Sequence, residues 1–121
     1  LTNLILDIKY RNPDIKIRLV GHSLGCDVIS HIQVPVESIH LFASPVEADR
    51  VIGLSSISGK TTNYYNPKDE VIKEGVEKGI SEMPSCLIDN LRTYGRDLET
   101  KRCYAKDHRF KSHIEKLRKF P

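Results

Sequence analysis

The alternation of strand-like and helix-like segments constrains the fold of this chain more than any other feature of its sequence. Apolar residues recur at a helical period in some segments and alternate with polar residues in others. We expect helices over residues 1–8, 24–34, 71–80 and 110–117, and strands over residues 15–20, 39–43, 61–65 and 102–105. Strands that alternate with helices form βαβ units. The sequence therefore predicts an α/β fold with a mostly parallel sheet flanked by helices.

Two stretches of the chain are harder to interpret. Residues 46–60 are rich in Ser and Gly and lack a clear period, and residues 81–95 are ambiguous. Within the second stretch, Leu87, Ile88 and Leu91 hint at a short helix. No repeat or linker divides the 121 residues, so we expect a single domain over residues 1–121. No apolar run approaches the roughly 20 residues that a membrane span requires.

The three cysteines, Cys26, Cys86 and Cys103, argue against two structural roles. Their number is odd and no pair has C-x-x-C spacing, which disfavours a disulfide framework and a zinc site. We expect buried packing residues, no metal and a reducing, cytoplasmic location.

Most of the net charge of +3 lies near the C-terminus. Residues 101–121 carry eight Lys or Arg against Asp107 and Glu115. Such a segment can bind nucleic acid or an anionic membrane surface. The solvated face of a helix is the commoner meaning, so we do not expect a nucleic-acid partner and keep a membrane surface as an alternative.

Gly21-His22-Ser23-Leu24-Gly25 is the motif that points to chemistry. This G-x-S-x-G sequence lies between an expected strand and an expected helix, the setting of a nucleophile elbow. Glycines at both ends leave room for close packing. The serine hydroxyl is raised above the sheet, and the backbone N–H of Leu24 can bind a forming oxyanion. The alternative is a glycine-flanked turn with a capping serine.

A serine nucleophile needs a base, and the base needs an orienting carboxylate. In chains with this elbow the acid and then the histidine follow the serine. Asp69 lies just after the strand expected at 61–65 and is the candidate acid, with Glu70 in reserve. Asp69 is also well placed to cap the helix that follows it.

Five histidines compete for the role of base. His22 lies inside the elbow and is expected to line the pocket, His31 is about 12 Å along the elbow helix from Ser23, and His40 is inside a strand. His108 follows the last expected strand and precedes the last helix, so it is the candidate base. His113, within that helix, looks structural.

Four segments resemble the C-terminal half of an α/β-hydrolase of the serine esterase and lipase type. They are the elbow at 21–25, the strand at 39–43 closed by Ser44-Pro45, the acid segment at 63–71, and Asp107-His108-Arg109-Phe110. The resemblance spans nearly the whole chain. It implies a carboxylic-ester hydrolase that forms an acyl-enzyme with Ser23, Asp69 and His108 and that needs no metal or organic cofactor.

The chain departs from the family pattern in two ways. Family members have several strands before the elbow, and one of the loops there supplies the second oxyanion N–H. We therefore expect a missing N-terminal segment or a second chain to complete the sheet and the site. Lys16 and Arg18 also lie on a strand that should be apolar on both faces. Either they extend to solvent at the start of the strand, or that face lacks its covering elements.

Two other classes of function stay open from the sequence. The elbow also serves thioesterases, peptidases, acyltransferases and haloperoxidases. A hydrolase-like domain or fragment could instead act as a non-catalytic binding or interaction module. That alternative predicts His108 and Asp69 too far from Ser23 to form hydrogen bonds.

Overall fold

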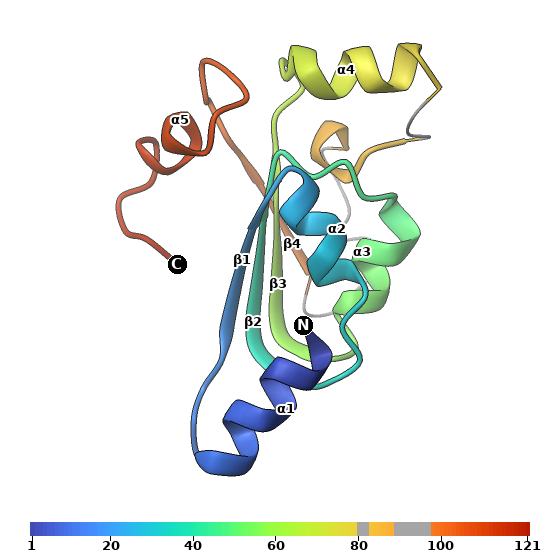
Figure 1. The fold of residues 1–121 in the computed structure, drawn as a ribbon. Coiled ribbons are helices and arrows are strands. Elements are labelled where there is room, and N and C mark those ends of the chain that lie inside the picture. Colours follow the sequence, from blue (N-terminus) through green and yellow to red (C-terminus); the bar gives the residue numbers. More distant parts are fainter. Residues whose placement is uncertain (80–82, 89–97) are drawn as a thin grey trace.

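The computed structural model describes residues 1–79, 83–88 and 98–121 as a parallel sheet with helices around it (Figure 1). The elements in chain order are α1 (Thr2–Arg11), β1 (Arg18–His22), α2 (Leu24–Ser30), β2 (Val36–Phe42), α3 (Ala48–Leu54), β3 (Ser58–Tyr65), α4 (Glu70–Glu77), the 3₁₀ turn η1 (Ser85–Leu87), β4 (Leu98–Arg102) and α5 (Phe110–Ile114). The expected α/β class is confirmed. None of the helices among these residues is long and apolar enough to cross a membrane.

All four strands are parallel, and their order in the sheet is β1-β2-β3-β4. Figure 1 shows α2 and α3 on one side of the sheet and α5 on the other. Because the strands run in the same direction, the segments that follow β1, β3 and β4 all leave the sheet at one edge. Ligands of open parallel sheets bind outside this carboxyl edge.

The core has two parts, one on each face of the sheet. Ile39 and Leu41 are fully buried in the larger cluster, where they pack with residues of α2 and α3. Phe42 and Tyr64 stack at 3.9 Å between ring centroids in the smaller cluster, against Phe110 of α5. Both parts of the core thus include residues of β2.

One helix was not expected, and several expected boundaries are wrong. The second helix ends at Ser30 instead of residue 34, and β2 and β3 begin at Val36 and Ser58 instead of residues 39 and 61. Residues 48–54 form α3, which the sequence did not indicate, because Gly53 within it and the serines after it obscure the apolar pair Val51 and Leu54. The last strand is Leu98–Arg102 instead of residues 102–105. The first strand begins at Arg18 instead of residue 15.

Two residues that we assigned to expected helices lie outside the described residues. These are Ile80, the expected end of the third helix, and Leu91. Leu87 belongs to η1, so the hint of a short helix is matched by one 3₁₀ turn.

The predicted apolar face of α1 is only partly used. Ile5 is 2% exposed, but Leu4 of the helix and Leu1 just before it remain exposed. In Figure 1, α1 lies at the end of the strands opposite α4, where it covers little of the sheet.

The basic residues at the start of β1 are paired across the sheet. Arg18 Nε donates to Glu37 Oε2 at 2.8 Å, and Lys16 Nζ lies 3.5 Å from Glu37 Oε1. Both basic side chains are mostly exposed. This arrangement fits the interpretation that they extend to solvent at the strand's start.

Cys26, Cys86 and Cys103 are buried and none is in a disulfide. Burial raises the pKa of the Cys26 thiol to about 12. Their predicted role as packing residues is confirmed.

Close packing of α2 on β1 depends on Gly21 and not on Gly25. A Cβ at Gly21 would lie 2.8 Å from Ile29 Cδ1 and 3.1 Å from both Cys26 Cα and Cys26 N. At Gly25 a Cβ would meet nothing within 4 Å. The expectation that both glycines leave room for close approach is therefore correct only for Gly21.

Alanine substitutions at the two glycines should consequently have different effects on the free energy of unfolding. Gly21→Ala forces backbone atoms of α2 away from β1 and should destabilise the fold by about 1–3 kcal/mol. Gly25→Ala adds a better helix former in open space and should be neutral or stabilising by up to about 1 kcal/mol. Urea unfolding of both variants measures the difference. Equal destabilisation by the two would contradict this account of the packing.

Candidate active site

Ser23 lies in the sharp turn between β1 and α2, with a backbone φ of 53° and ψ of −122°. Non-glycine residues rarely adopt this conformation, which costs about 1–3 kcal/mol and persists only where neighbours impose it. Ser23 N donates to Phe42 O at 3.0 Å, and Ser23 O accepts from Cys26 N at 3.0 Å. The main chain of Ser23 is therefore fixed to both β2 and α2.

The alternative of a capping serine does not match this geometry. Ser23 occupies the N-cap position of α2, but its side chain makes no capping hydrogen bond. Its hydroxyl points instead to residues 103–109 between β4 and α5, the histidine loop, where Ser23 Oγ lies 2.8 Å from His108 Nε2.

Asp69 follows β3 and uses its two carboxylate oxygens in different directions. Oδ1 accepts from Ile72 N at 3.1 Å and caps α4. Oδ2 lies 2.8 Å from His108 Nδ1. The side chain of Asp69 is fully buried. The expected helix cap is therefore present, and the same side chain also meets His108. The role of Asp69 as a catalytic acid stays a prediction.

His108 lies on the loop between β4 and α5 and bridges the other two residues. A carboxylate can only accept, so Nδ1 carries the proton and donates to Asp69. Nε2 is then left with a lone pair that accepts the hydroxyl proton of Ser23. The side chain is 19% exposed, so it is shielded yet still reachable from solvent. The arrangement can raise the nucleophilicity of a serine hydroxyl.

The structure brings together Ser23, Asp69 and His108 and places the competing candidates elsewhere. Glu70 is mostly exposed and pairs with Lys73 at 3.6 Å. The remaining histidines have other partners: His31 lies against Asp27 and Arg50, His40 against Ser38, and His113 Nδ1 donates to the carbonyl of Arg109.

Leu24 is the first residue of α2 and directly follows the candidate nucleophile. The first N–H groups of a helix have no acceptor within it, so the N–H of Leu24 is suitably placed in the chain for an oxyanion donor. The Leu24 side chain is 76% exposed. Its role at an oxyanion stays a prediction.

His22 has a place that the sequence did not indicate. We expected this elbow residue to line a pocket, but its Nε2 bonds the main-chain oxygen of His108. Its ring also lies close to the rings of His108, Phe110 and His113. Burial is the main cause that lowers the pKa of His22. No sequence signal identifies this contact, because it joins a side chain to a main-chain oxygen through the fold of the last loop.

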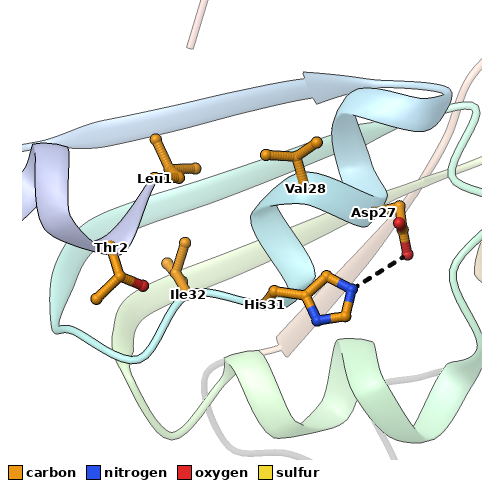
Figure 2. A pocket seen from close by; sticks show the side chains of 6 residues that line it. All are labelled: Leu1, Thr2, Asp27, Val28, His31 and Ile32. Atoms are coloured by element: carbon orange, nitrogen blue, oxygen red, sulfur yellow. Dashed lines mark ion pairs between the residues drawn. The ribbon is translucent and has the colours of Figure 1, made fainter.

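The hollows found among the described residues are not lined by the triad. Figure 2 shows one of about 290 Å³ between the start of α1 and α2, where His31 and Asp27 form an ion pair at 3.7 Å. None of the three triad residues lines it. A second, of about 270 Å³, is bordered by Asn66, Lys68 and Lys106, near the loops that carry Asp69 and His108.

Comparisons of the chain with protein-family models, curated proteins and solved structures found no match. The geometry of the three side chains therefore carries the functional conclusion.

Backbone strain at Ser23 can be measured by comparing two variants that both lack the hydroxyl. Glycine adopts the observed φ without steric cost, whereas alanine keeps a Cβ. Ser23→Gly should therefore be more stable than Ser23→Ala by about 1 kcal/mol, after the greater unfolded-state entropy of glycine is subtracted. Denaturant midpoints of the two proteins give this difference. An alanine variant more stable than the glycine variant would show that the turn is unstrained.

Lowered histidine pKa values predict the direction of acid destabilisation. His22 and His40 both have pKa values below 6.5, mainly because of burial. The unfolded chain therefore binds protons more readily than the folded protein. The contribution of these two histidines to the free energy of unfolding is complete above about pH 6.5, and it is lost as the pH falls through their pKa values in the folded state. Unfolding free energies measured from about pH 7.5 to about pH 5 should fall. The fall should be smaller in His22→Gln, and an unchanged slope in that variant would contradict the assignment.

Proposed function

We propose that this protein is a serine hydrolase that cleaves carboxylic esters through an acyl-enzyme intermediate. The supporting observation is the continuous chain of hydrogen bonds from Ser23 Oγ to His108 and from His108 to Asp69, each 2.8 Å long. A base within hydrogen-bond reach of its nucleophile and oriented by a third group is the diagnostic geometry of nucleophilic catalysis.

In the proposed mechanism His108 Nε2 takes the proton of Ser23 as Oγ attacks the ester carbonyl. Asp69 holds the imidazole in the required tautomer and stabilises the imidazolium that forms. The N–H of Leu24 donates to the oxyanion of the tetrahedral intermediate. His108 then protonates the leaving alcohol, and water attacks the acyl-enzyme with His108 as the base.

Several features are consistent with the resemblance to α/β-hydrolases. Ser23, Asp69 and His108 occur in the order that this fold uses. Each follows a different strand of an all-parallel sheet. We therefore propose that the chain represents the C-terminal half of such a hydrolase.

The proposed site uses a second oxyanion donor from outside the described residues. Loss of one such donor typically lowers the rate by about 10²–10³-fold. In the part of the chain that the structure describes, β1 is at the end of the sheet and pairs with β2 alone. We propose that a further segment or a second chain pairs with the free side of β1 and supplies the second oxyanion donor.

A non-catalytic binding module is the alternative class. It predicts a separated triad, whereas both hydrogen-bond distances favour the hydrolase. The elbow chemistry alone does not distinguish esters from thioesters or amides. A panel of short and long acyl esters, a thioester and an amide identifies the preferred bond.

The basic C-terminal segment offers less support for a binding function. Several of its charges have nearby partners: Lys101 with Glu99, Arg102 with the rings of Tyr65 and Tyr104, Arg109 with Asp107, and Lys111 with Glu115. These contacts favour a solvated charged surface over a nucleic-acid interface. Contact with a membrane surface stays a prediction, and binding to anionic vesicles at low salt tests it.

A fluorophosphonate probe tests the proposed nucleophile. The control Ser56→Ala alters an exposed serine just before the start of β3, at the opposite edge of the sheet from the triad. Wild type and this control should be labelled equally. Ser23→Ala should not be labelled, because it lacks the reacting oxygen. Asp69→Asn keeps the oxygen that caps α4 but opposes the required tautomer of His108, and should react about 10⁴-fold more slowly. Equal labelling of wild type and Ser23→Ala would overturn the proposal.

A further inference from the structure

We propose that His22 is a positioning residue, which holds the main chain of His108 so that its imidazole meets Ser23 and Asp69 at once. This inference rests on the proposed function and adds a residue that the triad mechanism does not use. The supporting contact is the hydrogen bond from His22 Nε2 to the carbonyl oxygen of His108, 2.5 Å long.

This bond fixes the histidine loop to the elbow itself. His22 and Ser23 are neighbours, and each contacts His108 from its own side chain. His108 is therefore held at three atoms: its carbonyl oxygen, Nδ1 and Nε2. Because one of these contacts is to the main chain, it restricts the loop and not only the rotation of the ring.

The hydrogen bonds of Asp107, the residue before His108, are local. Asp107 Oδ1 accepts from Arg109 N at 3.0 Å, and Asp107 Oδ2 accepts from the Arg109 guanidinium at 2.8 Å. These bonds shape the turn around His108 but do not join it to β1. In the part of the chain that the structure describes, the hydrogen bonds that join His108 to the elbow come from His22 and Ser23.

The ring of His22 is itself held in place by α5. Its centroid lies 5.5 Å from that of Phe110 and 5.4 Å from that of His113. His113 is fully buried and donates from Nδ1 to Arg109 O at 2.9 Å. A ring confined on this side cannot turn freely, so its Nε2 stays directed at the carbonyl of His108.

The protonation of His22 follows from its acceptor. A carbonyl oxygen only accepts, so Nε2 must carry a proton. Burial lowers the pKa of His22 most, and the hydrogen bond to the His108 carbonyl opposes this shift. The imidazoles of His108 and His113 lower the pKa further and Asp69 raises it, so the net direction is down. A neutral His22 donates the bond without placing a second positive charge beside the imidazolium that catalysis forms on His108.

Two substitutions separate the hydrogen bond from the packing of the ring. His22→Phe keeps an aromatic ring but removes the donor, whereas His22→Gln keeps an N–H donor of similar reach. We expect His22→Phe to react with the fluorophosphonate probe about 10- to 100-fold more slowly, because a displacement of about 1 Å in a catalytic group can cost 10²-fold. His22→Gln should recover most of the rate. His31→Gln, far from the triad, is the matched control and should equal wild type.

Steady-state kinetics on a chromogenic ester provides a second readout. The loss in His22→Phe should appear in kcat with KM little changed, because His22 acts through the base and not on bound substrate. If His22→Phe fails to fold, His22→Asn replaces it, since its shorter amide does not reach the carbonyl. Equal rates for wild type and the donor-free variant would overturn the proposal, as would a failure of His22→Gln to recover.

Proton NMR of histidine-labelled protein separates this inference from the proposed function. The deshielded Nδ1 proton of His108, assigned by its loss in His108→Asn, reports the bond to Asp69 without any turnover. It should be sharp in wild type and His22→Gln and broadened or lost in His22→Phe. That pattern without probe labelling of wild type would support the positioning role and overturn the hydrolase. An unchanged signal in His22→Phe would overturn the positioning role.

Discussion

Parallel strand pairing is the constraint on which the candidate site depends. Positions 23, 69 and 108 are far apart in the chain, yet each comes after a strand that runs in the same direction through one sheet. The turns after β1, β3 and β4 therefore meet at one edge. An antiparallel strand at any of the three places would send its residue to the opposite edge.

Local interactions then convert this shared edge into a defined geometry. The tight approach of α2 to Gly21 and the bond from Ser23 N to β2 set the nucleophile turn. The bond from Ile72 N to Oδ1 of Asp69 caps α4 and holds the carboxylate so that Oδ2 faces His108. The same contacts that end or begin secondary structure thus orient the side chains that would react.

The α/β class and the three meeting side chains could be predicted from the sequence because their signals are local. A period-2 strand followed by G-x-S-x-G and a helical period is readable within a few residues of Ser23. Asp69 and His108 follow from their places after expected strands. The sequence predicts the last strand four residues too late, because the side chains of β4 are mostly polar and do not alternate with apolar ones. Glu99, for example, pairs with Lys60. Cys103 and Ala105 are apolar and buried, but they pack beyond the strand's end.

The contact between His22 and His108 could not be predicted, because it depends on how the last loop folds back over the elbow. Side-chain direction in a strained turn is set by tertiary packing against Phe110 and His113. Sequence spacing carries no information about such a contact. The same limit applies to Gly25, whose surroundings are open despite its place in the motif.

Detection of the covalent intermediate tests the central claim most directly. A chromogenic ester mixed with excess protein should give a rapid burst of released alcohol, and intact mass analysis should show the added acyl group. Peptide mapping should place that group on Ser23. An ester hydrolysed without an acyl adduct, or an adduct on another side chain, would contradict the assignment of Ser23 as the nucleophile.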